Sequence, residues 1–241
     1  MTVVSVDRER RPMAKYTVSE EGSYRSVIVE LDRGEQFISE AGAMFRASDN
    51  IEIDVTTRSR GAGGLLSGVR RMMSGESFFL STYRARDGGP GEVGLAPTLA
   101  GDVVVIECSG TGGWLCAGGS YLGSSDGLSI DTEFQGFRGM LSGESLFFLD
   151  IEGKGQLLVS AFGSVKEVEV DGALTVDTGH VVAFQDTLEY TVGKAGGSWL
   201  QSFLSSEGVV MHFSGQGKAY LQSHNPDQFG QTLGGLMPPR S

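Results

Sequence analysis

The chain contains little cysteine, little proline and no long apolar run, and each shortage excludes a class of protein. Its 241 residues include 2 cysteines and 6 prolines. Two cysteines cannot build the framework of a disulfide-rich domain, and so few prolines argue against a disordered Pro-rich linker. No stretch of about 18 uninterrupted apolar residues is present to span a membrane. The charged run at residues 7–11 interrupts a brief apolar start, which is not typical of a signal peptide, so we expect a cytoplasmic protein.

The two cysteines, Cys108 and Cys116, flank a Gly-Thr-Gly-Gly sequence. They could face each other across a hairpin and oxidise, but two cysteines in a chain without an export signal are more often reduced and act as small hydrophobes. The histidines His180, His212 and His224 show no metal-ligand spacing with each other or with the cysteines. The sequence therefore predicts no structural zinc site and no cofactor.

The composition is that of a globular, mostly β protein. Apolar residues make up 39% of the chain and charged residues 20%, and 37 glycines indicate many tight turns. Residues 26–31, 51–55 and 165–170 are short, β-branched and partly alternating between apolar and polar side chains. That alternation is typical of half-buried strands, so we predict an all-β fold.

One segment recurs three times with its chemistry preserved. The copies are SGESFF at 74–79, SGESLF at 142–147 and, more loosely, SSEGVV at 205–210. An internal period of this kind usually means that one supersecondary unit has been copied until the copies bury a shared core.

Two further anchors extend the repeat on both sides. A glycine, a polar residue and an apolar run precede each copy, at 34–38, 101–105 and 179–183. A Gly-x-Gly turn follows each copy, at 89–91, 153–155 and 215–217. We therefore predict one β domain over residues 14–230, built from three pseudo-repeated units at about 14–97, 98–170 and 171–230. Residues 1–13 are predicted to be an N-terminal tail, and the glycines and prolines of 231–241 predict a loose C-terminal tail.

These residues support a family resemblance. Residues 35–44 (EQFISEAGAM), the Gly-Gly-Leu-Leu at 63–66 with Arg70 and Arg71, and residues 177–184 (DTGHVVAF) together resemble the altered-inheritance-of-mitochondria family of uncharacterised proteins. The likeness covers roughly residues 14–225. It implies a β-sandwich or barrel-like ring similar to the tryptophan RNA-binding attenuation protein and assembly into a homotrimer. It implies no established enzymatic activity.

The repeated glutamates Glu76, Glu144 and Glu207 are the first candidate site. In a pseudo-threefold ring they would point in related directions, and if they converged they could share a cation or a proton. The alternative, which we favour, is that each one caps or solvates a turn before a strand. The serines beside them lie in no nucleophile elbow and have no histidine partner in the sequence, so we expect no enzyme.

A glycine-rich segment at residues 61–74 is the best candidate interaction site, and four arginines lie within it or just before it. The residues that we single out are Arg58, Arg60, Gly64, Leu65, Leu66, Arg70 and Arg71. In a chain of formal net charge -11 they form a local basic island, which could bind phosphate groups on a membrane surface or contact a protein partner. The alternative is a loop that packs on a neighbouring unit, and the absence of a Gly-Lys-Ser/Thr ending excludes a P-loop.

Two classes of function remain open at this point. The acidic balance, 30 acidic against 19 basic residues, opposes a nucleic-acid backbone, so nucleic-acid binding is not expected. The first class is a non-enzymatic trimeric β scaffold that contacts a membrane peripherally or a protein partner through the Gly/Leu/Arg-rich segment. The second class is a small-molecule or metal-binding module with sites between the repeats.

Overall fold

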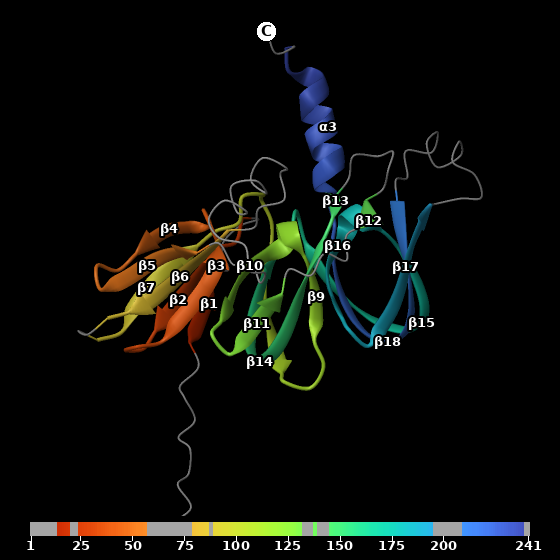
Figure 1. The fold of residues 1–241 in the computed structure, drawn as a ribbon. Coiled ribbons are helices and arrows are strands. Elements are labelled where there is room, and N and C mark those ends of the chain that lie inside the picture. Colours follow the sequence, from red (N-terminus) through yellow and green to blue (C-terminus); the bar gives the residue numbers. More distant parts are fainter. Residues whose placement is uncertain are drawn as a thin grey trace, which may run out of the picture.

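The chain folds into antiparallel β-sheets with one helix at its C-terminal end (Figure 1). The computed structural model describes residues 14–19, 24–56, 79–86, 89–131, 137–138, 145–194 and 209–238. The predominance of strands confirms the all-β prediction. Closure of three units into a ring, and likeness to the tryptophan RNA-binding attenuation protein, stay predictions.

A four-stranded sheet forms one layer of the N-terminal part. In spatial order its strands are β1 (Lys15–Val18), β2 (Val27–Leu31), β7 (Gly91–Leu95) and β4 (Met44–Ala47). Its strands show the expected alternation: Val27, Val29 and Leu31 are fully buried while Glu30 is exposed. One face therefore packs on the core and the other meets water.

The remaining long strands belong to one continuous twelve-stranded sheet. Along its main path the order is β15 (Val165–Asp177), β18 (Val209–Gln222), β16 (Val181–Gln185), β9 (Trp114–Ala117), β14 (Phe148–Ser160), β10 (Tyr121–Ser125), β3 (Gln36–Glu40), β6 (Leu80–Ala85) and β5 (Ile51–Thr56). Off this path, β8 (Val103–Ser109) and β11 (Leu128–Asp131) pair with β14, and β17 (Leu188–Lys194) pairs with β18. A short pair, β12 (Phe137–Arg138) and β13 (Ser145–Leu146), stands apart.

Strand β14 holds the middle of the molecule together. Its first half pairs with β9 and β11, and its second half pairs with β8 and β10. One strand therefore serves two layers, which is possible because β14 is 13 residues long and crosses from one to the other. Strand β15 is equally long and continues unbroken past residue 170, where the sequence placed the boundary between the second and third units.

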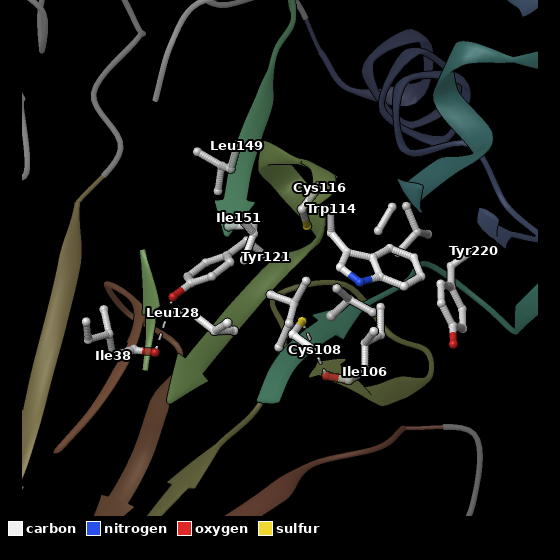
Figure 2. Packing of buried hydrophobic residues seen from close by; sticks show 14 of the residues in the cluster. Ile38, Ile106, Cys108, Trp114, Cys116, Tyr121, Leu128, Leu149, Ile151 and Tyr220 are labelled. Carbon is white, nitrogen blue, oxygen red and sulfur yellow. Dashed lines mark hydrogen bonds between the residues drawn. The ribbon is translucent and has the colours of Figure 1, made fainter. Parts of the chain in front are cut away.

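Three hydrophobic clusters fill the space between these layers. The N-terminal cluster lies between the four-stranded sheet and strands β3, β5 and β6, and includes Phe37, Tyr83 and Leu95. The middle cluster contains both cysteines and joins residues from β3 to β18 (Figure 2). The C-terminal cluster centres on Phe184 and Phe213.

Two of the three Gly-x-Gly sequences, 153–155 and 215–217, lie inside the strands β14 and β18 and do not form the turns that the sequence predicted, whereas 89–91 leads into β7. Gly89, Gly153 and Gly215, the first glycine of each sequence, have φ angles of 120°, 112° and 106°. Residues other than glycine rarely adopt a positive φ angle of this size, so each of these positions favours glycine.

The helix α3 spans Pro226–Leu236, although the sequence predicted a loose tail from residue 231 onward. Asn225 caps it: its Oδ1 accepts hydrogen bonds from the backbone N–H of Asp227 at 2.9 Å and of Gln228 at 3.3 Å. Pro226 occupies the first turn, where a missing N–H has no cost. The helix projects beyond the sheets (Figure 1), and Phe229 packs on Phe162 with ring centroids 5.0 Å apart.

Candidate functional site

The candidate residues that the sequence singled out all lie outside the described residues. These are Arg58, Arg60, Gly64, Leu65, Leu66, Arg70 and Arg71 of the glycine-rich segment, and Glu76, Glu144 and Glu207 of the repeat. The structure therefore does not test whether they meet. The strands that flank them are paired, since Thr56 lies opposite Leu80 and Lys194 lies opposite Val209.

A cavity of about 400 Å³ provides a different candidate site. Segments far apart in the sequence form its walls: the end of β3, residues 97–99, the 3-10 turn η1 (Gly118–Ser120), the turn after β14, the 3-10 turn η2 (Thr178–His180) and the start of α3. Its volume lies within the range of pockets that hold small molecules.

Glu40 is the acidic residue that β3 places at this cavity. Ile38 and Glu40 share one face of the strand, the face that packs on the middle cluster. Burial raises the pKa of the Glu40 carboxyl to about 7. Among the described residues, no hydrogen bond or ion pair to this carboxyl offsets the loss of solvation. Near neutral pH the group can therefore hold or release a proton.

Other polar groups on the cavity wall differ in whether they have partners. Both polar atoms of the Gln222 side chain have partners. Its Oε1 accepts a hydrogen bond from the N–H of Phe162 at 2.8 Å, and its Nε2 donates to the carbonyl of Gly179 at 2.8 Å. Those two bonds tie the turn after β14 and the turn η2 to the end of β18. Ser120 is 4% exposed, and its hydroxyl makes no hydrogen bond within the described part of the chain.

The apolar part of the wall includes Phe147, Phe162, Leu99 and Val181. Gly118 is required beside Phe147, because a Cβ at that position would overlap the Phe147 ring. The cavity thus combines aromatic rings with a small number of polar groups, which is typical of small-molecule sites.

Neither cysteine lines this cavity, but Cys116 lies next to it and interacts with Glu40. Both are free and buried, as expected of small hydrophobes. Burial raises the pKa of the Cys108 thiol to about 11, and burial together with the Glu40 carboxylate raises the pKa of Cys116. Neither thiol is therefore an activated nucleophile. Figure 2 shows Cys116 above the Trp114 side chain, with Tyr121 pointing toward Ile38, whose carbonyl accepts its hydroxyl hydrogen bond at 3.4 Å.

The described residues contain no group of three or more His, Cys, Asp or Glu side chains placed to hold a metal ion. None of the helices in the described part of the chain combines the length and apolar character that a membrane crossing requires.

Comparison with known proteins agrees with this fold. The family model described as mitochondrial biogenesis AIM24 matches residues 16–224. The chain belongs to the AIM24 family. This result confirms the family resemblance seen in the sequence.

Two streptococcal proteins illustrate the similarity. The chain is 32% identical over 233 residues to an uncharacterised protein of Streptococcus pyogenes serotype M6, a match that covers 94% of this chain and 92% of the relative. An X-ray crystal structure of a Streptococcus pyogenes protein from the Northeast Structural Genomics Consortium superposes with a TM-score of 0.77 at 31% identity. That match covers 93% of this chain and 100% of the solved chain. Neither relative carries an enzymatic name.

Sequence reasoning missed Glu40, although the residue lies in the segment 35–44 that carries the family resemblance. A glutamate at the end of a strand usually faces water. Its surroundings come from residues 97–99, 117–120 and 226–227, which nothing in the local pattern connects to β3.

The raised pKa of Glu40 predicts a pH-dependent stability. Because the folded-state pKa of about 7 lies above the ordinary 4.5, the folded protein binds this proton more tightly than the unfolded chain does. Stability is therefore lost as pH rises from about 4.5 to 7, and the loss is complete above that range. Solvent screening of a partly exposed carboxyl reduces the effect, so we expect Glu40→Gln to gain about 1–2 kcal/mol over the parent at pH 8.

Urea unfolding at pH 4.5 and at pH 8 measures this gain. The matched control is Glu189→Gln, which replaces an exposed residue on β17 outside the cavity. Its stability relative to the parent should be the same at the two pH values. An equal effect of Glu40→Gln at both pH values would contradict the prediction.

Proposed function

We propose that this protein is a non-enzymatic β scaffold that acts as a homotrimer and binds a partner. The observation that carries the proposal is an exposed apolar edge on the N-terminal part of the molecule. It is formed by Met44 and Phe45 on β4 and by Ile53 and Val55 on β5. In Figure 1 these two strands lie together at the outer edge, opposite the end that holds β15 and β17.

The apolar edge is a continuation of the hydrophobic core. Ile51, Ile53 and Val55 share one face of β5, and exposure rises along it from 9% to 44% to 62%. Phe45 is 53% exposed on the neighbouring edge strand. A contiguous apolar patch that continues from the core to the surface is typical of an interaction site, whereas single apolar residues scattered over a surface are not.

A second copy of the chain is the partner that fits this edge. Strand β5 is the last strand on the path of its sheet, and no described strand pairs with its outer side. Such an edge has free backbone N–H and C=O groups and invites pairing with another chain. The expectation of three subunits per assembly rests on the family resemblance. Contact of the Gly/Leu/Arg-rich segment with a membrane surface or a protein partner stays a prediction.

Substitution of the apolar edge tests the assembly. We expect Ile53→Thr with Val55→Thr to raise the dissociation constant of the trimer at least about 100-fold, because two exposed apolar side chains that the interface would bury lose several kcal/mol of that burial. Threonine keeps the strand propensity of both positions. Sedimentation velocity over a range of concentrations measures the change.

The matched control places threonine on the opposite face of the same strand, as Glu52→Thr with Asp54→Thr. This variant should assemble like the parent. Equal assembly of both variants, with both folded, would remove the apolar edge as the interface.

A second candidate function is that of a small-molecule binding module, and the cavity at Glu40 favours it. The cavity lies between parts of the chain that the sequence assigned to different repeats, as that alternative expects. Its buried carboxyl and unpartnered hydroxyl are the kind of polar groups that orient a ligand.

A further inference from the structure

The charges on the cavity wall are of one sign. Glu40 and Asp227 both line it, and no lysine, arginine or histidine is found among the described residues of its wall. Asp227 lies in the first turn of α3. Two carboxylates beside low-dielectric walls create a negative potential, which attracts cations and repels anions.

The other groups of the wall fit an organic cation better than a metal ion. A metal ion needs several ligand atoms close together, and no cluster of three such side chains exists in the described part of the chain. The aromatic rings of Phe147 and Phe162 instead offer apolar surface and negative ring faces. Rings of this kind attract an ammonium group and also pack against an alkyl body.

We propose that the cavity binds a small organic amine whose ammonium group pairs with the Glu40 carboxylate. This proposal rests on the ligand-binding function proposed above and names the chemical class of its ligand. The buried Ser120 hydroxyl accepts a second hydrogen bond from the ammonium group, and the apolar body of the amine lies against Phe147 and Phe162. Asp227 adds to the attraction at the side of the cavity where α3 begins.

Binding of an amine depends on the protonation of Glu40. The titratable group next to this carboxyl is the Cys116 thiol of β9, whose raised pKa keeps it neutral, and Asp227 of α3 is the other acidic residue on the cavity wall. Since the pKa of Glu40 is about 7, its ionised fraction rises about tenfold between pH 6 and pH 8. The affinity for an ammonium group should rise by the same factor, and binding should release protons.

Isothermal titration calorimetry of the full chain with three probes of similar size tests the proposal. The probes are hexylamine, 1-hexanol and hexanoate, which carry a positive, a neutral and a negative head group. At pH 8 we expect one hexylamine per chain, at least tenfold weaker binding of 1-hexanol, and no binding of hexanoate. Glu40→Gln should weaken hexylamine at least tenfold, whereas Glu189→Gln should bind it like the parent.

The outcomes separate this proposal from the ligand-binding function on which it rests. If 1-hexanol binds as tightly as hexylamine and Glu40→Gln changes neither, the cavity binds ligands but the ammonium proposal is overturned. If none of the three probes binds to the folded parent, both fail. Asp227→Asn provides a milder variant that keeps the helix start, and it should weaken hexylamine but not 1-hexanol.

Discussion

Replacing Gly101 by alanine is expected to destabilise the protein by at least about 3 kcal/mol. Gly101 lies against Gly163 in a parallel bridge between the chain before β8 and the turn after β14. A Cβ at position 101 would overlap the carbonyl oxygen of Ala161 and would lie 2.6 Å from the backbone nitrogen of Gly163. Backbone atoms cannot rotate away as a side chain can, so the two segments must separate.

That separation would break several hydrogen bonds at once. The N–H of Asp102 donates to the carbonyl of Gly163 at 2.8 Å, and the N–H of Gly163 donates to the carbonyl of Ala100 at 3.0 Å. The N–H of Arg25 also donates to the carbonyl of Gly101 at 2.9 Å, so the same site anchors the N-terminal strands. Each lost bond costs about 0.5–1.5 kcal/mol, which adds to the steric cost.

Thermal unfolding measures this effect, and a fall in Tm of about 6–12 °C is expected for a domain of this size. Gly119→Ala is the control, because a Cβ at Gly119 meets no atom within 4 Å. A Gly101→Ala variant that melts within 2 °C of the parent would show that the two segments do not approach as closely as described.

Truncation of Phe184 is expected to destabilise the protein by about 3–5 kcal/mol. The side chain of Phe184 is fully buried at the centre of the C-terminal cluster. Its ring contacts three others, with centroid distances of 5.2 Å to Phe148, 5.2 Å to Tyr190 and 5.0 Å to Phe213. Alanine would lose the burial of the ring and these edge-to-face contacts, and would leave a cavity that strands β16 and β18 cannot close.

Chemical denaturation of Phe184→Ala and of Phe229→Ala compares a buried ring with a ring on α3. Phe229 is 42% exposed and has one ring contact among the described residues, with Phe162, so its truncation should cost about 1 kcal/mol or less. Similar losses for the two variants would contradict the assignment of Phe184 to the core.

The strands could be predicted from the sequence because their periodicity is local. In β2, alternate residues are buried, and the β-branched runs at 51–55 and 165–170 became β5 and part of β15. The approximate boundary that the sequence placed after residue 170 lies within β15, which spans Val165–Asp177. Gly172 has a φ angle of 105° and sits opposite Gly215 in an unbroken ladder, so the strand bends there and continues.

The three anchor glycines show what the sequence could not supply. Gly34, Gly101 and Gly179 hold equivalent places in the repeat, and the sequence marked all three. Gly34 has a φ angle of 80°, and a Cβ there would meet no atom within 4 Å. A Cβ at Gly101 would instead overlap backbone atoms, and a Cβ at Gly179 would overlap the Asn225 side chain. Whether a glycine is required at a position, and for what reason, depends on its backbone conformation and on contacts between distant segments.

The C-terminal helix and the cavity were missed for related reasons. Two glycines and two prolines near the end of the chain indicated a loose tail, but Asn225 followed by Pro226 is a helix start that the sequence did show. Asp227 in this helix then becomes part of the same cavity wall as Glu40. The site could not be found from either segment alone.

Native mass spectrometry of the intact protein measures assembly through the apolar edge. We expect a trimer for the parent chain and for Glu52→Thr with Asp54→Thr, and mainly monomer for Ile53→Thr with Val55→Thr. A parent chain that is monomeric at every concentration at which it stays folded would show that the apolar edge does not assemble the protein.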